Sequence, residues 1–173
     1  MSYLIAIVIA WFLALLNASA LPYVQVLGVT PDLVLIFAVC WAMVRGQDEA
    51  LFVVPLAGFL RDLNTSDPLG TSVLAMAPVV LLAAAIRLRA LDTEFVPTIA
   101  VVAGGSLAYG VISMMVLAAT GQDIQWLDAL LTVTLPGMLV NALFTPILYL
   151  PVHWLGHRRR EGLQGAGRLT SPL

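Results

Sequence analysis

His153 and His157 are the residues of this chain best placed to bind a metal ion. They are four positions apart and therefore share one face of a helix. A zinc site needs three or four ligands, and no third candidate is evident. The sequence also lacks a glycine-rich phosphate loop, a cysteine cluster and a Ser-His-Asp set. We therefore predict a protein that is not an enzyme and that holds no metal or cofactor.

Three aspartates lie next to apolar segments, and one of them needs an explanation. Asp32 and Asp67 precede or open a helical segment, where a carboxylate meets the positive end of the helix dipole. Asp62 instead ends a segment, where the dipole disfavours an acid. It should have a partner: Arg61, a nearby helix N-terminus or another protein. We favour a local pair or cap.

Every charge in the sequence lies at the end of an apolar segment, and no polar group at a segment midpoint suggests transport of ions or protons. Charges within membrane segments usually serve transport or proton transfer. A proton pump or an intramembrane protease therefore lacks its expected residues. Cys40 is the single cysteine and cannot form an intramolecular disulfide.

The composition indicates an integral membrane protein. Hydrophobic residues make up 61% of the 173 positions and charged residues only 10%, whereas a soluble domain carries about 25% charged residues. All eight basic residues are arginine, and no basic stripe lies outside the C-terminal region. Binding of nucleic acid is therefore not expected.

The apolar residues fall into six segments, which predicts an all-α, polytopic bundle of six transmembrane helices. The second segment carries helix-start signals in Thr30 as N-cap and Pro31 at the first helical position. The second and third segments are short for full spans. The sixth is long, and its part up to about residue 135 is expected to lie along the membrane interface, with Trp126 as an anchor. The segments are 3–21, 31–44, 50–60, 68–86, 95–119 and 127–155.

The arginine distribution predicts the orientation. With six spans and the N-terminus inside, the outer loops carry only Arg61, while seven arginines lie inside. Both termini are then cytoplasmic. We expect one transmembrane domain over residues 1–157 and a disordered cytoplasmic tail over 158–173. The first segment has no basic residue before it, so a cleaved leader is not expected. The inner arginines are Arg45, Arg87, Arg89, Arg158, Arg159, Arg160 and Arg168.

Small residues repeat every four positions on the first segment and form one flat face. Such faces allow close approach of another helix. The neighbour is either a helix of this chain or a partner subunit, and we favour packing within the chain while keeping the stripe as a candidate docking face. The stripe consists of Ala6, Ala10, Ala14 and Ala18.

The loop between the third and fourth segments carries a motif that resembles the MreD family of rod-shape-determining membrane proteins. The match is a glycine, an aspartate four residues later, and Pro-Leu-Gly opening the next helix. Pro31 and Asp32 fit the second helix of the family, and 141–149 resembles its last helix. Arg61 departs from the family, where an apolar residue is usual. The motif residues are Gly58, Asp62, Pro68, Leu69 and Gly70.

The resemblance implies a non-enzymatic scaffold or regulator of the bacterial cell-elongation complex, located in the cytoplasmic membrane. MreD proteins work with MreC, and that complex links the cytoskeletal protein MreB to RodA and its class B penicillin-binding transpeptidase in peptidoglycan synthesis. The family fold is similar to the substrate-binding components of energy-coupling-factor vitamin transporters. Partner contact through the motif residues is what the resemblance implies for this chain.

An alternative function is that of a vitamin-binding subunit of such a transporter. A vitamin site needs a pocket with converging polar groups. The predicted outer loops offer few polar side chains for it, so the scaffold function is favoured. Those side chains are Gln25, Asn64, Thr65, Gln122 and Gln125.

Overall fold

The computed structural model describes residues 2–87 and 95–169, and these residues are helical apart from loops and one isolated bridge between Val26 and Val29. The predicted all-α class is confirmed. The α-helices are α1 (Ser2–Ser19), α2 (Leu33–Arg45), α3 (Gln47–Asp62), α4 (Thr71–Arg87), α5 (Phe95–Ala119), α6 (Trp126–Ala129) and α7 (Leu135–Leu169), with a short 3-10 helix at Leu21–Tyr23 and a π-helix at Leu130–Thr134.

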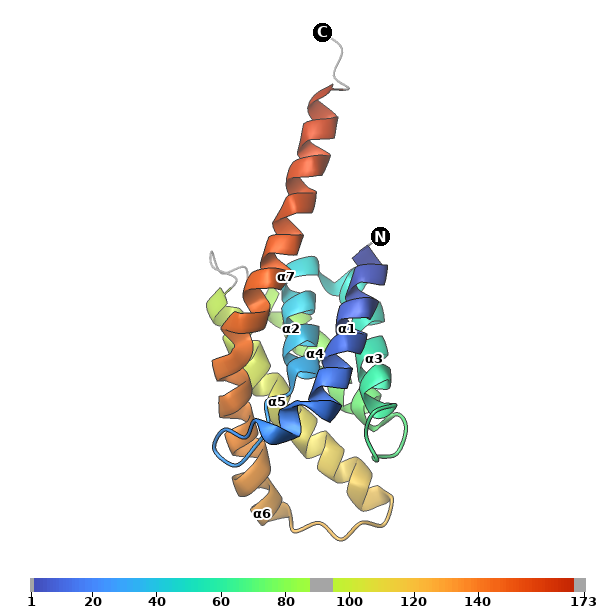
Figure 1. The fold of residues 1–173 in the computed structure, drawn as a ribbon, viewed down its shortest axis with the longest axis vertical. Coiled ribbons are helices and arrows are strands. Elements are labelled where there is room, and N and C mark those ends of the chain that lie inside the picture. The colour runs from blue at the N-terminus through green and yellow to red at the C-terminus, as the bar shows by residue number, and fades with distance from the viewer. Residues whose placement is uncertain (1, 88–94, 170–173) are drawn as a thin grey trace.

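The long helices run alternately up and down, and α1 begins at the end of the bundle where α7 leaves it (Figure 1). Helix α6 lies at the opposite end, which we call the α6 end. Helix α4 packs between α3 and α5, and α7 packs against α5 and α2. Helix α1 packs against α3 and α2.

Helix α2 is the centre of the molecule and contacts all five other long helices. Every residue from Val34 to Met43 is buried, and the rings of Phe37 and Trp41 pack with their centroids 5.5 Å apart. Because the other helices enclose α2 on all sides, few of its residues reach the outside of the bundle. Its length of only 13 residues therefore does not have to match the length of the outer helices.

The start of α2 differs from the prediction. Asp32, not Thr30, is the N-cap, because its side chain accepts a hydrogen bond from the Leu35 amide at 3.1 Å. Pro31 therefore precedes the helix and does not open it. One other prediction is confirmed, since α5 has the predicted bounds. The last segment runs from α6 through the π-helix into α7 as one apolar helical stretch, Trp126–Leu155. That its first part lies along the membrane interface stays a prediction.

Helix α7 continues to Leu169, past residue 158, where the sequence analysis places the start of a disordered tail. Arginine, glutamate, leucine and glutamine are good helix formers and dominate this stretch. The division into domains at this point stays a prediction. The sequence predicts a charged loop over 87–94; Arg87 instead ends α4, and residues 88–94 lie outside the described residues, as do residues 170–173.

The alanine stripe of α1 faces the interior. Ala6, Ala10 and Ala14 are 0–1% exposed and belong to the hydrophobic core, whereas Ala18 is exposed. Large apolar side chains such as Val8 and Phe12 cover the outer side of the helix. The stripe thus serves packing within the chain, and three of its four residues are not available to dock a partner.

Two helical stretches are long and apolar enough to cross a membrane, Phe95–Ala119 and Trp126–Leu155. Three apolar stretches are shorter, at Tyr3–Ser19, Leu33–Arg45 and Thr71–Ala83. The two long stretches are mostly not buried inside the bundle. They present large apolar side chains outward, such as Leu139, Leu143 and Ile147 on α7.

Candidate functional site

Gly58 lies where α3 and α4 approach most closely. A Cβ added to this glycine would lie 3.0 Å from both the Cα and the amide nitrogen of Val73. These are backbone atoms, which cannot turn aside as a flexible side chain can. The glycine of the motif therefore permits the close contact of the two helices.

Asp62 closes the loop that follows α3. Its carboxylate accepts hydrogen bonds from the amide of Gly70 at 2.8 Å and from the amide of Ser72 at 3.0 Å. These amides belong to the start of α4, where backbone donors have no partner within the helix. Asp62 is only 1% exposed. The predicted local cap is thus confirmed, and the helix it caps is the next one along the chain.

The other motif residues complete the loop. Gly70 has a φ of +95°, a conformation that residues with a side chain rarely adopt. The carbonyl oxygen of Pro68 accepts hydrogen bonds from the amide and the hydroxyl of Thr71 at 3.1 and 2.7 Å. Leu69 is 69% exposed and is the one motif residue of this loop whose side chain points mostly away from the protein.

Arg61 pairs with Asp32 and not with its neighbour Asp62. The distance between Nη2 of Arg61 and Oδ2 of Asp32 is 3.1 Å, and the side chains are only 17% and 12% exposed. The guanidinium also donates to the hydroxyl of Ser72 at 3.1 Å and lies over the ring of Tyr109, 4.7 Å from its centroid. The two hydroxyls of Ser72 and Tyr109 are 3.0 Å apart. One arginine thus joins α2, α3, α4 and α5.

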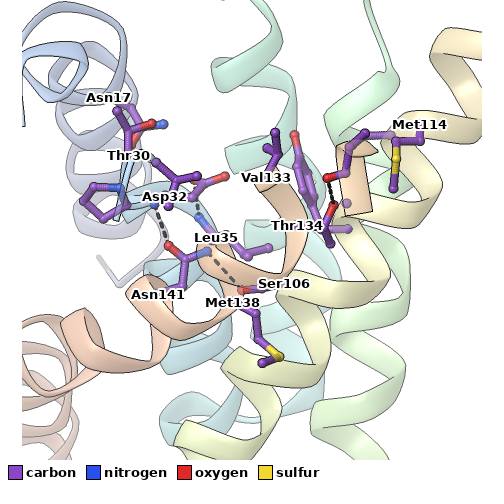
Figure 2. A pocket seen from close by; sticks show the side chains of 18 of the residues that line it. Asn17, Thr30, Asp32, Leu35, Ser106, Met114, Val133, Thr134, Met138 and Asn141 are labelled. Carbon is purple, nitrogen blue, oxygen red and sulfur yellow. Dashed lines mark hydrogen bonds between the residues drawn. The ribbon is translucent and has the colours of Figure 1, made fainter. Parts of the chain in front are cut away.

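Asn141 of α7 ties the start of α2 to two other helices. Its side-chain oxygen accepts from the amide of Asp32 at 2.7 Å, and its nitrogen donates to the hydroxyl of Ser106 at 3.0 Å. Figure 2 shows Asn141 between these two residues. Asn17 of α1 accepts from the amide of Leu33 at 3.1 Å. Side chains therefore satisfy the first amides of α2, which are buried from water.

These contacts form one polar cluster, which connects six helices. Asp32 and Asp62 are candidates from the sequence, whereas the hydrogen bonds of Ser106, in the middle of α5, and of Asn141, buried in α7, were not predicted. The sequence signal for these two members of the cluster is an isolated polar residue within an apolar segment. The cluster consists of Asn17, Asp32, Arg61, Asp62, Ser72, Ser106, Tyr109 and Asn141.

A cavity of about 500 Å³ lies beside the polar cluster. Its walls come from α1, the loop before α2, α5 and the region from α6 to the start of α7. Figure 2 shows polar side chains such as Asp32 and Asn141 on one side, and apolar side chains such as Met114 and Val133 on another. The predicted outer-loop residue Gln25 also lines this cavity.

The described residues offer no metal centre. They contain no group of three histidine, cysteine, aspartate or glutamate side chains that could hold a metal ion. The ring of His153 stacks on Tyr149 with their centroids 5.2 Å apart. The side chain of His157 lies outside the described residues. The arrangement of the polar cluster is that of a structural network, since Arg61 pairs with Asp32 and Asp62 accepts hydrogen bonds from backbone amides.

A comparison with known families matches residues 1–158 to the family described as rod shape-determining protein MreD. The chain belongs to the MreD family. This confirms the resemblance found in the sequence. MreD proteins are membrane proteins with a role in rod-shape determination, and the family is a structural one, generally without enzymatic activity. The comparisons with curated proteins and with solved structures give no match, so the predicted likeness to vitamin-transporter components stays a prediction.

Proposed function

We propose that this MreD protein is a non-enzymatic, multi-pass subunit of the cell-elongation complex in the bacterial cytoplasmic membrane. In this role it binds MreC and supports peptidoglycan synthesis, and through MreC it is linked to RodA, its class B penicillin-binding transpeptidase and MreB. The observation that carries the proposal is the family match over residues 1–158. The polar cluster supports it, because it holds the helices together without presenting a reactive group.

The proposed membrane arrangement has six spans with both termini in the cytoplasm. The alternating direction of the long helices fits this arrangement (Figure 1). The arginine count of the loops assigns the α6 end to the outer side. The loop 63–70 and the cavity then face the periplasmic side, and the loop between α2 and α3 faces the cytoplasm.

We place the partner contact at the loop that follows α3. Gly58, Asp62 and Gly70 fix the shape of this loop from inside the protein, as described above. Leu69 is the more exposed of the two leucines that the loop presents. Exposed leucines fixed on a rigid turn are suited to bind an apolar surface of another protein, because little entropy is lost on binding.

The test is retention of MreC after purification in mild detergent. Wild-type protein should retain MreC, and Leu69→Ala should reduce the retained amount several-fold without changing the melting temperature. Leu63→Ala is the matched control, because Leu63 is also exposed and lies in the same loop. Equal retention by Leu69→Ala and wild type would remove this loop from the interface.

The same purification tests the role in the elongation complex and the alternative of a vitamin transporter subunit. A protein that purifies alone, or with ATPase subunits and a tightly bound vitamin, would contradict the scaffold function. A chromosomal deletion complemented by the wild-type gene should restore rod-shaped cells. Cells that keep a normal rod shape without the gene would also contradict it.

A further inference from the structure

The cavity beside the polar cluster has the composition of a ligand site. Its volume of about 500 Å³ lies within the range of roughly 300–1,000 Å³ that is usual for small-molecule pockets. Apolar side chains form much of its wall, and a few polar groups converge on one side. Such a wall suits a molecule with an apolar body and a small polar end.

The charges of the wall select for an uncharged ligand. Among the described residues, Asp32 and Arg61 are the charged ones that line the cavity, and they pair with each other at 3.1 Å. A ligand with a net charge would find no unpaired counter-charge, and it would lose the hydration that stabilises it in water. A neutral polar group avoids this cost.

The unused hydrogen-bonding groups of the wall indicate what the polar end contains. Ser113 lines the cavity, and its hydroxyl is buried without a hydrogen-bond partner among the described residues. Asn141 uses its oxygen on the amide of Asp32 and its nitrogen on the hydroxyl of Ser106. Asn17 uses its oxygen on the amide of Leu33, so its nitrogen is the amide donor left for another partner. A nitrogen donor and a hydroxyl fit the carbonyl and hydroxyl oxygens of a ligand.

The edge of the cavity indicates where the ligand comes from. Val133 lines the cavity and is 59% exposed. In the proposed membrane arrangement, this side chain and its neighbours Leu131 and Leu127 face the outer leaflet. The cavity is therefore continuous with a lipid-facing surface.

We propose that this cavity binds a neutral, oxygen-bearing amphiphile from the outer leaflet, with its hydroxyl or ester end at Ser113. A glyceride with a single acyl chain is an example of this chemistry. The inference rests on the membrane arrangement proposed above. It assigns the protein a lipid-binding site in addition to its contacts with other proteins.

The test uses a monoacylglycerol that carries a photoreactive diazirine in its chain, with the protein in phosphatidylcholine nanodiscs. Crosslinks should map to cavity residues such as Met114 and Met138. Unlabelled monoacylglycerol should compete at least about fivefold better than the fatty acid and the alkylamine of the same chain length, since only the neutral head avoids an unpaired charge. Free glycerol should not compete, because it lacks the apolar body.

Two variants test the position of the ligand. Gly137 lines the cavity, and a Cβ added there meets no atom within 4 Å, so Gly137→Leu should fill the space and abolish the crosslink. Ala100→Leu adds the same bulk to an exposed position outside the cavity and is the control. Ser113→Ala removes no internal hydrogen bond and should weaken binding by about fivefold, as expected for one hydrogen bond.

Some outcomes would overturn the proposal. These are crosslinks spread over the outer apolar surface, crosslinks unchanged in both Gly137→Leu and Ser113→Ala, or equal competition by the charged analogues. Retention of MreC and cell shape are measured for the same variants. A variant that loses the crosslink but keeps MreC and the rod shape would support the lipid site separately from the scaffold function. A wild-type protein that does not retain MreC would contradict only the scaffold function and not the lipid site.

Discussion

The carboxylate of Asp62 supplies the cap that α4 lacks. Gly70 precedes this helix and has no side chain, so the amides of Gly70 and Ser72 depend on an acceptor from α3. Asp62→Ala should leave these buried donors without a partner, at a cost of roughly 1–3 kcal/mol in the free energy of unfolding. Thermal unfolding in detergent measures this loss.

The control for Asp62 is Asp67→Ala in the same loop, because Asp67 is only partly buried. Its melting temperature should stay close to that of the wild type. Loss of MreC binding or of rod shape in Asp62→Ala would then arise through the shape of the loop, since Asp62 itself is buried. An unchanged melting temperature for Asp62→Ala would show that the cap contributes little.

The ion pair of Arg61 and Asp32 allows a test of how much an unpaired buried charge lowers the free energy of unfolding. Arg61→Gln leaves the Asp32 carboxylate without its counter-charge in a site that is mostly buried. The cost should be up to roughly 3 kcal/mol, the low end for a broken buried pair. Asp32→Asn together with Arg61→Gln restores neutrality and should cost less than the sum of the single changes. Strictly additive losses of unfolding free energy would argue against coupling.

At the scale of the elements, the contact of α3 with α4 depends on Gly58. Gly58→Ala places a methyl group 3.0 Å from the backbone of Val73, so the two helices have to separate. Such overpacking costs about 1–3 kcal/mol. Gly104→Ala is the control, since its nearest contact would be a side-chain atom of Leu82 at 3.9 Å. Equal melting temperatures of the two variants would contradict the close contact.

Helix α1 gives a second test of packing. Ala10 is buried against the neighbouring helices, so Ala10→Leu should lower the free energy of unfolding by roughly 1–3 kcal/mol. Ala18→Leu on the same stripe should have little effect, because Ala18 is exposed. If Ala10→Leu had the unfolding free energy of the wild type but no longer retained MreC, the stripe would instead be a docking face.

The helices were more predictable from the sequence than the site. Apolar runs between polar breaks indicate helices directly, and α5 was predicted with its observed bounds. The N-cap of α2 was misplaced, because Thr30 and Asp32 both fit a local capping pattern. The partners of Arg61 could not be predicted, since Asp32 and Tyr109 are distant in sequence and meet only in the folded bundle. Arg61 looked like a departure from its family and proved central to the polar cluster.

At the scale of the whole molecule, the number of membrane crossings depends on whether α3 spans the membrane. It has 16 residues and is therefore about 24 Å long at 1.5 Å per residue, somewhat short for a hydrocarbon core of about 30 Å. It carries Asp48 and Glu49 at one end and Arg61 and Asp62 at the other. In the proposed arrangement these two ends lie on opposite sides of the membrane.

Two single cysteines test this arrangement, in a background where buried Cys40 is replaced by alanine. Gln47 is the first residue of α3 and Ser66 lies in the loop after this helix, and both are exposed. In cells with a permeabilised outer membrane, a membrane-impermeant maleimide should label Ser66→Cys at once. It should label Gln47→Cys only after the inner membrane is opened, because the arginine distribution places that loop inside. Labelling of both cysteines from the same side would mean that α3 does not cross, and the reversed pattern would place the cavity and the loop 63–70 in the cytoplasm.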